Sequence, residues 1–163
     1  MLFRSVMAVE YDADIVDSFN RAHGTGYAPR DVASVLASEV KDSKAELFHA
    51  SPVCKNFSKA NRLREPNDSD LVSAKAVAGV IRQARPLHVT IENVPAYADS
   101  ELFTLITDAL NEAGYNWRQT IVDAADLGAP QRRRRLIVQA TLGGSLPSLP
   151  QKQTPGDWYK AVV

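Results

Sequence analysis

The sequence predicts an α/β domain in which a doubly wound, mostly parallel sheet carries helices on both faces. Three observations lead to this prediction. Short apolar runs without polar alternation, typical of strands buried on both faces, recur along the chain. Between them lie stretches whose apolar residues repeat at helical spacing. Strand and helix therefore alternate through nearly the whole sequence, which is the order that parallel sheets require.

The length and composition predict one globular domain with a substantial core. The chain has 163 residues, 45% of them hydrophobic, and its 19 basic residues balance its 19 acidic ones. A single cysteine cannot form an internal disulfide, which fits a reducing compartment. No apolar run is long enough for a membrane span, and no signal peptide begins at Met1. We therefore expect a cytoplasmic protein with no membrane partner.

The first half of the chain begins almost inside a strand. Ser5–Val9 is an apolar run that fits a buried strand. From Asp12 to His23 apolar residues recur at helical spacing, and acids at the start suit the positive end of the helix dipole. Arg30–Val32 fits a short strand end. After a segment with scattered apolar residues, Glu46–Ala50 predicts the next strand.

The second half continues the alternation. Residues 55–70 are polar and charged and predict a long surface loop, which in a compact domain is usually functional. Asp70 is suited to cap a helix that ends before Pro86, and Ser100 is suited to cap another that stops at Gly114. Strands are expected at Leu87–Ile91, Trp117–Val122 and Leu136–Val138. We divide the chain into a core over residues 1–142 and a proline-containing, loop-like tail over residues 143–163.

Four polar groups lie at or just beyond the expected strand ends: Glu10, Cys54, Glu92 and the arginine run after Gln131. Because the carboxyl ends of parallel strands line one edge of a sheet, we expect these groups to converge in one crevice. Each has a simpler interpretation. The cysteine could be a small buried hydrophobe, the glutamates could be surface or capping acids, and the arginines could be a solvated charge run. No metal site is expected.

The spacing of the arginines predicts a division between two faces. If Arg132–Arg135 lead into a strand at Leu136, side chains alternate, so Arg133 and Arg135 share one face. A planar guanidinium suits phosphate oxygens, a base carbonyl or a carboxylate such as Glu92. A cation close to a thiol also favours the reactive thiolate.

Three motifs resemble, in order and separation, catalytic motifs of the cytosine carbon-5 DNA methyltransferases. They are Ser-Pro-Val-Cys at 51–54, Glu-Asn-Val-Pro at 92–95, and Ala-Pro-Gln-Arg-Arg-Arg-Arg at 129–135, where Gln131, Arg133 and Arg135 match Gln-x-Arg-x-Arg. Two weaker matches lie upstream, Ala-Val-Glu-Tyr-Asp at 8–12 and Arg-Asp-Val at 30–32. The resemblance extends from about Val6 to the end of the chain. It implies a Rossmann-like methyltransferase core, incomplete at both ends, and suggests DNA methylation or restriction-modification as its context.

The resemblance implies covalent catalysis on a cytosine that has been flipped out of double-stranded DNA. Cys54, as thiolate, would attack carbon 6, and Glu92 would hydrogen-bond the ring nitrogen N3 and the exocyclic amine. Arg135 would contact the cytosine O2, while Arg133 would support a phosphate or the Glu92 carboxylate. After methyl transfer, a base would remove the carbon-5 proton and elimination would release Cys54.

The same resemblance implies S-adenosyl-L-methionine as the cofactor. Glu10 would accept the two ribose hydroxyls, Tyr11 would stack on the adenine, and Asp31 would accept from the adenine amine. Val32 and Pro52 complete the cofactor-binding residues that the matching motifs indicate.

Several departures from the family pattern accompany these matches. Val53 and Lys55 stand where the family usually has a second proline and a glutamine. The Phe-x-Gly-x-Gly loop that holds the methionine half of the cofactor is absent, and the tail would lead toward a target-recognition region outside this chain. We therefore interpret the chain as a catalytic fragment, inactive alone, that acts with a complementing chain. Two alternatives stay open: a non-catalytic module that binds nucleic acid or a partner, and a transfer RNA cytosine methyltransferase.

Overall fold

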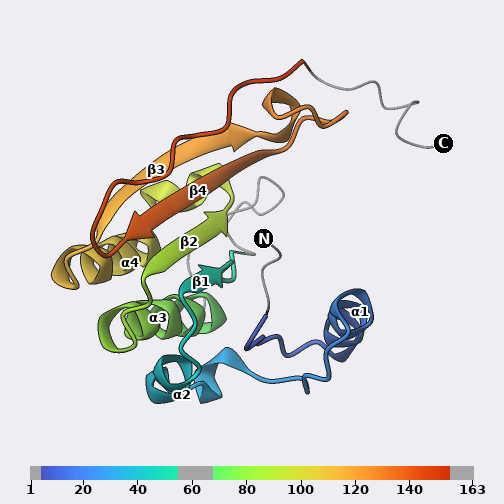
Figure 1. Ribbon diagram of the computed structural model, residues 1–163, viewed down its shortest axis with the longest axis vertical. Coiled ribbons are helices and arrows are strands. Elements are labelled where there is room, and N and C mark those ends of the chain that lie inside the picture. The colour runs from blue at the N-terminus through green and yellow to red at the C-terminus, as the bar shows by residue number, and fades with distance from the viewer. Residues whose placement is uncertain (1–4, 55–67, 155–163) are drawn as a thin grey trace.

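The computed structural model describes residues 5–54 and 68–154, so most of the expected loop at 55–70, including Lys55, and the end of the tail lie outside the described residues (Figure 1). One sheet has the strand order β1-β2-β4-β3. Its strands are β1 (Leu47–Ala50), β2 (His88–Asn93), β3 (Asn116–Asp123) and β4 (Arg134–Thr141). The predicted α/β class is confirmed, and each strand expected from Glu46 onward is present.

The sheet is mixed, so the expectation of a mostly parallel sheet is wrong. β1 and β2 run parallel, but β4 runs antiparallel to both of its neighbours, β2 and β3. The connection over residues 124–133 contains only the short 3-10 helix η4 (Ala124–Asp126), and a turn of this kind returns the chain in the antiparallel direction. As a consequence, the start of β4 lies beside the end of β2, where Asn93 pairs with Leu136.

Two helices, α3 (Asp68–Gln83) and α4 (Glu101–Glu112), pack against each other and cover one face of the sheet (Figure 1). The side chains of β2 and β4 alternate, and those that point at the helices are buried. The core formed in this way includes Ala74, Val77, Ile81, Val89, Ile91, Ile106, Leu110, Leu136 and Val138. Burial of this continuous apolar surface is the main term that holds helices and sheet together.

Of the two helix caps predicted from the sequence, one is confirmed and one is wrong. Ser100 caps α4 as predicted, because its hydroxyl accepts the backbone N–H of Phe103. Asp70 is not the cap of α3, which already begins at Asp68. Asp70 instead lies in the first turn of α3 and is fully buried.

The opposite face of the sheet is polar, and none of the helices in the described part of the chain covers it. His49 Nδ1 lies 2.8 Å from Thr90 Oγ1 across β1 and β2, and Arg118 of β3 donates to Gln139 of β4 at 2.7 Å. Helices on both faces are therefore not seen over residues 5–54 and 68–154. This polar face continues to Glu92 near the end of β2.

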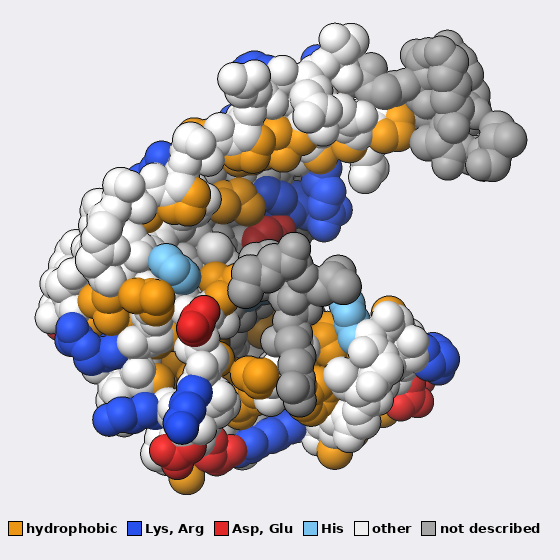
Figure 2. All heavy atoms as spheres, viewed as in Figure 1, with side chains coloured by type: hydrophobic (Ala, Val, Ile, Leu, Met, Phe, Trp, Pro, Cys, Tyr) orange, Lys and Arg blue, Asp and Glu red, His pale blue; other side chains and the backbone are white. Residues whose placement is uncertain are grey.

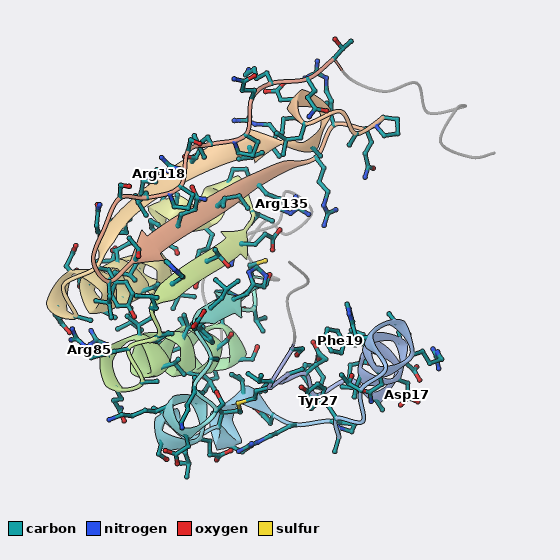
Figure 3. The ribbon with its side chains drawn as sticks, in the orientation of Figure 1. Asp17, Phe19, Tyr27, Arg85, Arg118 and Arg135 are labelled. Carbon is teal, nitrogen blue, oxygen red and sulfur yellow. The ribbon has the colours of Figure 1, made fainter. Side chains whose placement is uncertain are left out.

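The N-terminal segment lies apart from the sheet (Figure 1). Ser5–Val9, expected as a strand, is irregular with a bend at Val6, and it pairs with none of the described strands. Helix α1 (Ala13–His23) confirms the prediction for 12–23, with Asp12 as its N-cap, and Phe19 packs on Tyr27 at a ring-centroid distance of 6.2 Å (Figure 3).

The link from α1 to the sheet is also helical. The short strand end expected at Arg30–Val32 is not formed. Asp31 instead accepts the N–H of Ala33 and caps the 3-10 helix η1 (Val32–Ser34). Helix α2 (Ala37–Asp42) follows, and both η1 and α2 pack against α3. None of the described helices has the length and apolar character needed to cross a membrane.

Candidate active site

Cys54 lies in the turn that leaves the C-terminal end of β1. The thiol is half-buried and packs against the edge of the hydrophobic core. The turn is tied to β2, because Asn93 Nδ2 donates to the Pro52 carbonyl at 3.0 Å and Asn93 Oδ1 accepts the N–H of Val94 at 2.8 Å. These contacts place the thiol beside the motif at 92–95.

Glu92 is held from two sides at the end of β2. Ser51 Oγ donates to Glu92 Oε2 at 2.6 Å, and Arg135 Nε lies 2.6 Å from Glu92 Oε1. The register explains this meeting: Glu92 pairs with Ile137, and Arg135 is two residues away on the same face of β4. Arg135 therefore lies at the edge of the sheet where β2 ends (Figure 3).

Both charged side chains keep access to solvent. About a quarter of each remains exposed, 24% for Arg135 and 29% for Glu92. Figure 2 shows basic and acidic side chains together in a hollow between the sheet and the N-terminal segment. A planar, polar ligand could therefore reach this pair from outside without the core having to open.

The charges of Glu92 and Arg135 both act on the Cys54 thiol. Burial is the main reason that the pKa of Cys54 lies above its ordinary value. The backbone N–H of Val94 opposes this effect, the carboxylates of Glu92 and Asp70 add to it, and Arg135 lowers the pKa. Without a ligand, the thiol is therefore held mainly in its neutral form.

The described ion pair of Glu92 is with Arg135, and the contacts of Arg132 and Arg133 are with Asp123 instead. Arg132 forms a long, exposed ion pair with Asp123 at 3.5 Å, and the N–H of Arg133 donates to Asp123 Oδ1 at 3.0 Å. The Arg133 side chain is exposed, as is Arg134. Arg135 holds the Glu92 carboxylate, a contact that the sequence allowed for Arg133.

The residues expected at the cofactor lie at the start of the described chain. The N–H of Arg30 donates to the Glu10 carbonyl at 2.7 Å, which brings Glu10 close to Asp31. Asp31 and the Tyr11 ring are exposed, and Val32 is half-buried. The Glu10 carboxylate accepts the N–H of Asp12 at 3.0 Å, and the Asp31 carboxylate accepts the N–H of Ala33 at 2.8 Å. Pro52, by contrast, is buried.

Three residues that were not among the predicted site residues contribute contacts. Ser51 holds Glu92, Asn93 holds the Cys54 turn, and the buried Ser73 of α3 accepts the Val53 N–H at 3.1 Å. Ser51 and Asn93 lie inside recognised motifs, which is a signal that could have found them. Ser73 has no such signal, because only the packing of α3 brings it to the turn.

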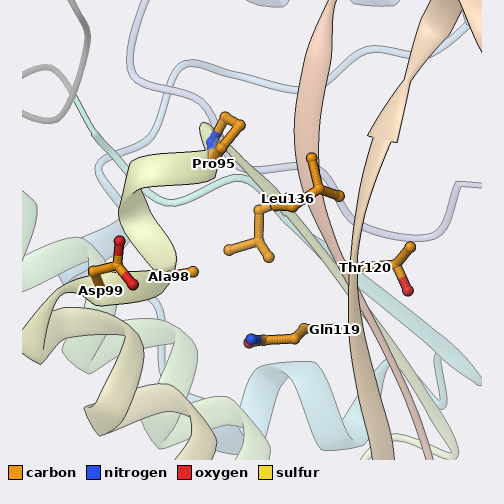
Figure 4. Close-up of a pocket in the computed structure, with 7 residues that line it drawn as sticks. Pro95, Ala98, Asp99, Gln119, Thr120 and Leu136 are labelled. Atoms are coloured by element: carbon orange, nitrogen blue, oxygen red, sulfur yellow. The ribbon is translucent and has the colours of Figure 1, made fainter.

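A pocket of about 320 Å³ is separate from this site (Figure 4). Its lining includes Pro95, Asp99, Gln119 and Leu136. Leu136 points to the helix-covered face, whereas Glu92 and Arg135 lie on the opposite face. The pocket therefore does not form part of the candidate site.

Comparison with known proteins agrees with the geometry. A family model for the C-5 cytosine-specific DNA methylases matches residues 1–160. The chain is 32% identical over 123 residues to the type II methyltransferase M1.HgaI of Avibacterium volantium, covering 68% of this chain and 34% of that protein. It is 26% identical over 138 residues to the type II methyltransferase M.FnuDI of Fusobacterium nucleatum, covering 83% of this chain and 40% of that protein. The chain thus spans between a third and two fifths of these relatives.

Solved structures share the fold. The Dnmt2 methyltransferase of S. pombe superimposes with a TM-score of 0.72 at 22% identity, over 87% of this chain and 43% of that one. The EhMeth methyltransferase of Entamoeba histolytica gives a TM-score of 0.68 at 18% identity, over 91% of this chain and 48% of that one. The fold is that of a methyltransferase core, and the family model covers nearly the whole sequence. The chain therefore belongs to the C-5 cytosine-specific DNA methylase family.

Proposed function

We propose that this chain is the part of a DNA cytosine-5 methyltransferase that performs the covalent step, with Cys54 as the nucleophile. The observation that carries the proposal is the position of Glu92, which lies between the Ser51 hydroxyl and the Arg135 guanidinium and interacts with the Cys54 thiol. At one edge of the sheet, a thiol can attack the face of a pyrimidine ring, while a carboxyl group and a guanidinium can hydrogen-bond its two polar edges.

In the proposed reaction, the Cys54 thiolate forms a bond to carbon 6 of a flipped cytosine. A proton shared between the Glu92 carboxyl group and N3 neutralises the charge that this addition places on the ring, and Glu92 accepts a hydrogen bond from the exocyclic amine. S-adenosyl-L-methionine would supply the methyl group that becomes bonded to carbon 5, with its sulfur–methyl bond broken and the neutral thioether S-adenosylhomocysteine as the leaving group. A base then takes the carbon-5 proton, and the bond between Cys54 and carbon 6 breaks, which restores the thiolate. Arg135 contacts the cytosine O2, and Arg133 supports a phosphate of the bound DNA.

The raised pKa of Cys54 has a place in this proposal. A neutral thiol is protected from chance reactions while no substrate is bound. A base that hydrogen-bonds Glu92 offsets its negative charge, which is one of the groups that raise the pKa of Cys54. Substrate binding would thus reduce one of the contributions that disfavour the thiolate.

Cofactor binding is proposed for the N-terminal segment. Glu10 would hold the ribose hydroxyls, Tyr11 would stack on the adenine, and Asp31 would accept from its amine, with Val32 beside the ring. Pro52 would contribute by fixing the turn between cofactor and substrate. Because the relatives are much longer than this chain, we propose that it works together with segments equivalent to those that flank the matched region in them, either in the same polypeptide or in a complementing chain.

A mechanism-based trap tests the proposal. The chain, supplied with those flanking segments, is incubated with S-adenosyl-L-methionine and duplex DNA that contains 5-fluorocytosine, and the product is analysed by mass spectrometry. We expect an adduct on Cys54 that Cys54→Ser abolishes. A mixture that binds both DNA and cofactor yet forms no adduct, or forms one elsewhere, would contradict the proposal. The same reaction with transfer RNA in place of DNA tests the alternative substrate, since faster methyl transfer to transfer RNA than to DNA would favour it.

A non-catalytic nucleic-acid-binding module is the second candidate, and the partial burial of the Cys54 thiol, which raises its pKa, favours it. Titration of the complemented chain with S-adenosyl-L-methionine separates the two. A catalytic core should bind the cofactor, and Glu10→Ala should weaken that binding. A module that has lost the chemistry should bind DNA but show no cofactor binding.

A further inference from the structure

The peptide group between Pro52 and Val53, one residue before Cys54, is held at both ends. Its carbonyl accepts from Asn93 Nδ2 at 3.0 Å, and its N–H donates to Ser73 Oγ at 3.1 Å. The C=O and N–H of a trans peptide point in opposite directions. The plane of this peptide is therefore fixed between β2 on one side and α3 on the other.

Ser73 is an unusual residue for its place in α3. It is 5% exposed and lies among apolar residues of the same helix, such as Ala74 and Val77, that form the core. A buried hydroxyl is unfavourable unless it is hydrogen-bonded, and a serine in a helix gains nothing from intrinsic propensity. The bond to Val53 gives the hydroxyl its partner and gives a half-buried amide an acceptor.

The identity of residue 53 explains why an acceptor is needed. Val53 has a backbone N–H, whereas a proline at this position would have none and would also fix its own φ angle. With valine, the φ angle of residue 53 is free to rotate and must be restrained, and the backbone N–H of residue 53 needs an acceptor. One hydroxyl on α3 meets both requirements.

We propose that Ser73 is a positioning residue for Cys54, and that it restrains through the Val53 amide a turn that Asn93 alone would leave free to rotate. Its importance for catalysis rests on the proposed function. The restraint itself is a property of the turn and can be measured on the thiol without DNA or cofactor. A failure of the restraint and a failure of the proposed function are therefore distinguishable.

The thiol is a convenient reporter, because Cys54 is the chain's one cysteine. Its pH-dependent rate of alkylation by iodoacetamide gives both its pKa and its accessibility. In Ser73→Ala the freed turn should expose the thiol, so we expect roughly threefold faster alkylation at neutral pH and a pKa that falls toward the ordinary value. In Ser73→Thr, which keeps the hydroxyl, the profile should return toward that of the wild type.

A double-mutant cycle tests the route through the amide. Val53→Pro removes the N–H, so Ser73→Ala should change the alkylation rate far less in the Val53→Pro background than in the wild type. Equal effects of Ser73→Ala in both backgrounds would overturn the proposal. Ser43→Ala is the matched control, because this half-buried serine also bonds the backbone, at the end of α2, and should leave the profile unchanged.

Amide hydrogen exchange gives a second measurement that does not depend on how well the proline variant folds. The Val53 amide should exchange roughly tenfold faster in Ser73→Ala than in the wild type, while the amides of β2 keep their protection. An unchanged Val53 amide, or a profile that Ser43→Ala alters as strongly as Ser73→Ala, would refute the role of Ser73. If the restraint is measured but no DNA adduct forms, the proposed function fails and the restraint stands.

Discussion

Arg135 Nε lies 2.6 Å from Glu92 Oε1, across the one antiparallel pairing that joins β2 to β4. This ion pair connects two motifs that are far apart in the sequence, and it exists because β4 turns back along β2. With four parallel strands, the residue before Leu136 would emerge at the other edge of the sheet. The reversed strand therefore brings the arginine to the carboxylate.

Removal of the Arg135 guanidinium should disable the site more than it disturbs the fold. We expect Arg135→Ala to slow adduct formation with 5-fluorocytosine DNA by roughly 10²-fold, because Glu92 loses its orientation and the base loses a donor. Arg135→Lys should recover little, since an ammonium cannot reproduce the planar fork.

The matched control for Arg135 is Arg132→Ala. The Arg132 side chain is 83% exposed and pairs loosely with Asp123, so its loss should change stability by less than about 1 kcal/mol. Thermal unfolding followed by circular dichroism checks this. If Arg132→Ala reduces the adduct rate as much as Arg135→Ala, general loss of positive charge explains the effect better than the Glu92 contact does.

Ser51→Ala should weaken catalysis through Glu92 alone. The Ser51 hydroxyl gives the carboxylate its second hydrogen bond, so its removal should reduce the adduct rate by about tenfold, as expected for one hydrogen bond to a charged group. Ser18→Ala, on the exposed surface of α1, is the control and should have no effect. A Ser51→Ala rate equal to that of the wild type would show that Arg135 is enough to orient Glu92.

The pH dependence of stability should show alkaline loss. Burial raises the pKa of Tyr115 to about 12 from an ordinary value of 10.0, and the pKa of Tyr97 is also raised, first by burial. A raised pKa in the folded state contributes stability that is present below the unfolded value and is lost as the pH rises toward the folded value. We therefore expect the melting temperature to fall as the pH rises above about 10.

Tyr115→Phe isolates one of these groups. The Tyr115 hydroxyl donates to the Pro86 carbonyl, so its removal should cost about 1 kcal/mol at neutral pH and should also make the alkaline loss shallower. Urea unfolding at neutral and alkaline pH measures both effects. An unchanged alkaline slope in Tyr115→Phe would place the titration at other residues.

Local patterns predicted most of the elements but not their relative placement. The helical spacing of apolar residues and the cap at Ser100 predicted both ends of α4 closely. The β-branched residues predicted the strand β2. Ser5–Val9 has the composition of a strand, yet a strand also needs a neighbour, and residues 5–9 have none in the described part of the chain. The direction of β4 depends on the turn at 124–133, which carries no apolar pattern.

The candidate site was predictable to the extent that its residues belong to motifs. Cys54, Glu92 and Arg135 were each found from their sequence context, and the structure brings them together. Ser73 was not predictable in this way. Its contact with Val53 depends on the rotation of α3 against the sheet, and a lone serine in an apolar helical stripe gives no indication of which buried amide it will meet.

Asp123 should control the turn that delivers the arginines. Its Oδ1 accepts the backbone N–H groups of Ala125 and Arg133, at 3.2 Å and 3.0 Å, and its Oδ2 faces Arg132. Although burial alone would raise its pKa, these hydrogen bonds and Arg132 hold the pKa below its ordinary value. Stability from this carboxylate is therefore present above the unfolded value and lost as the pH falls through the lowered folded value.

Three variants separate the charge of Asp123 from its hydrogen bonds. Asp123→Asn keeps an acceptor for both N–H groups and should reduce the adduct rate only slightly. Asp123→Ala removes the acceptor, so the turn at 124–133 should loosen, the adduct rate should fall by roughly tenfold, and the unfolding free energy should decrease. If Asp123→Asn proves as damaging as Asp123→Ala while Arg132→Ala is harmless, the negative charge itself, and not the caps it forms, holds Arg133 and Arg135 in place.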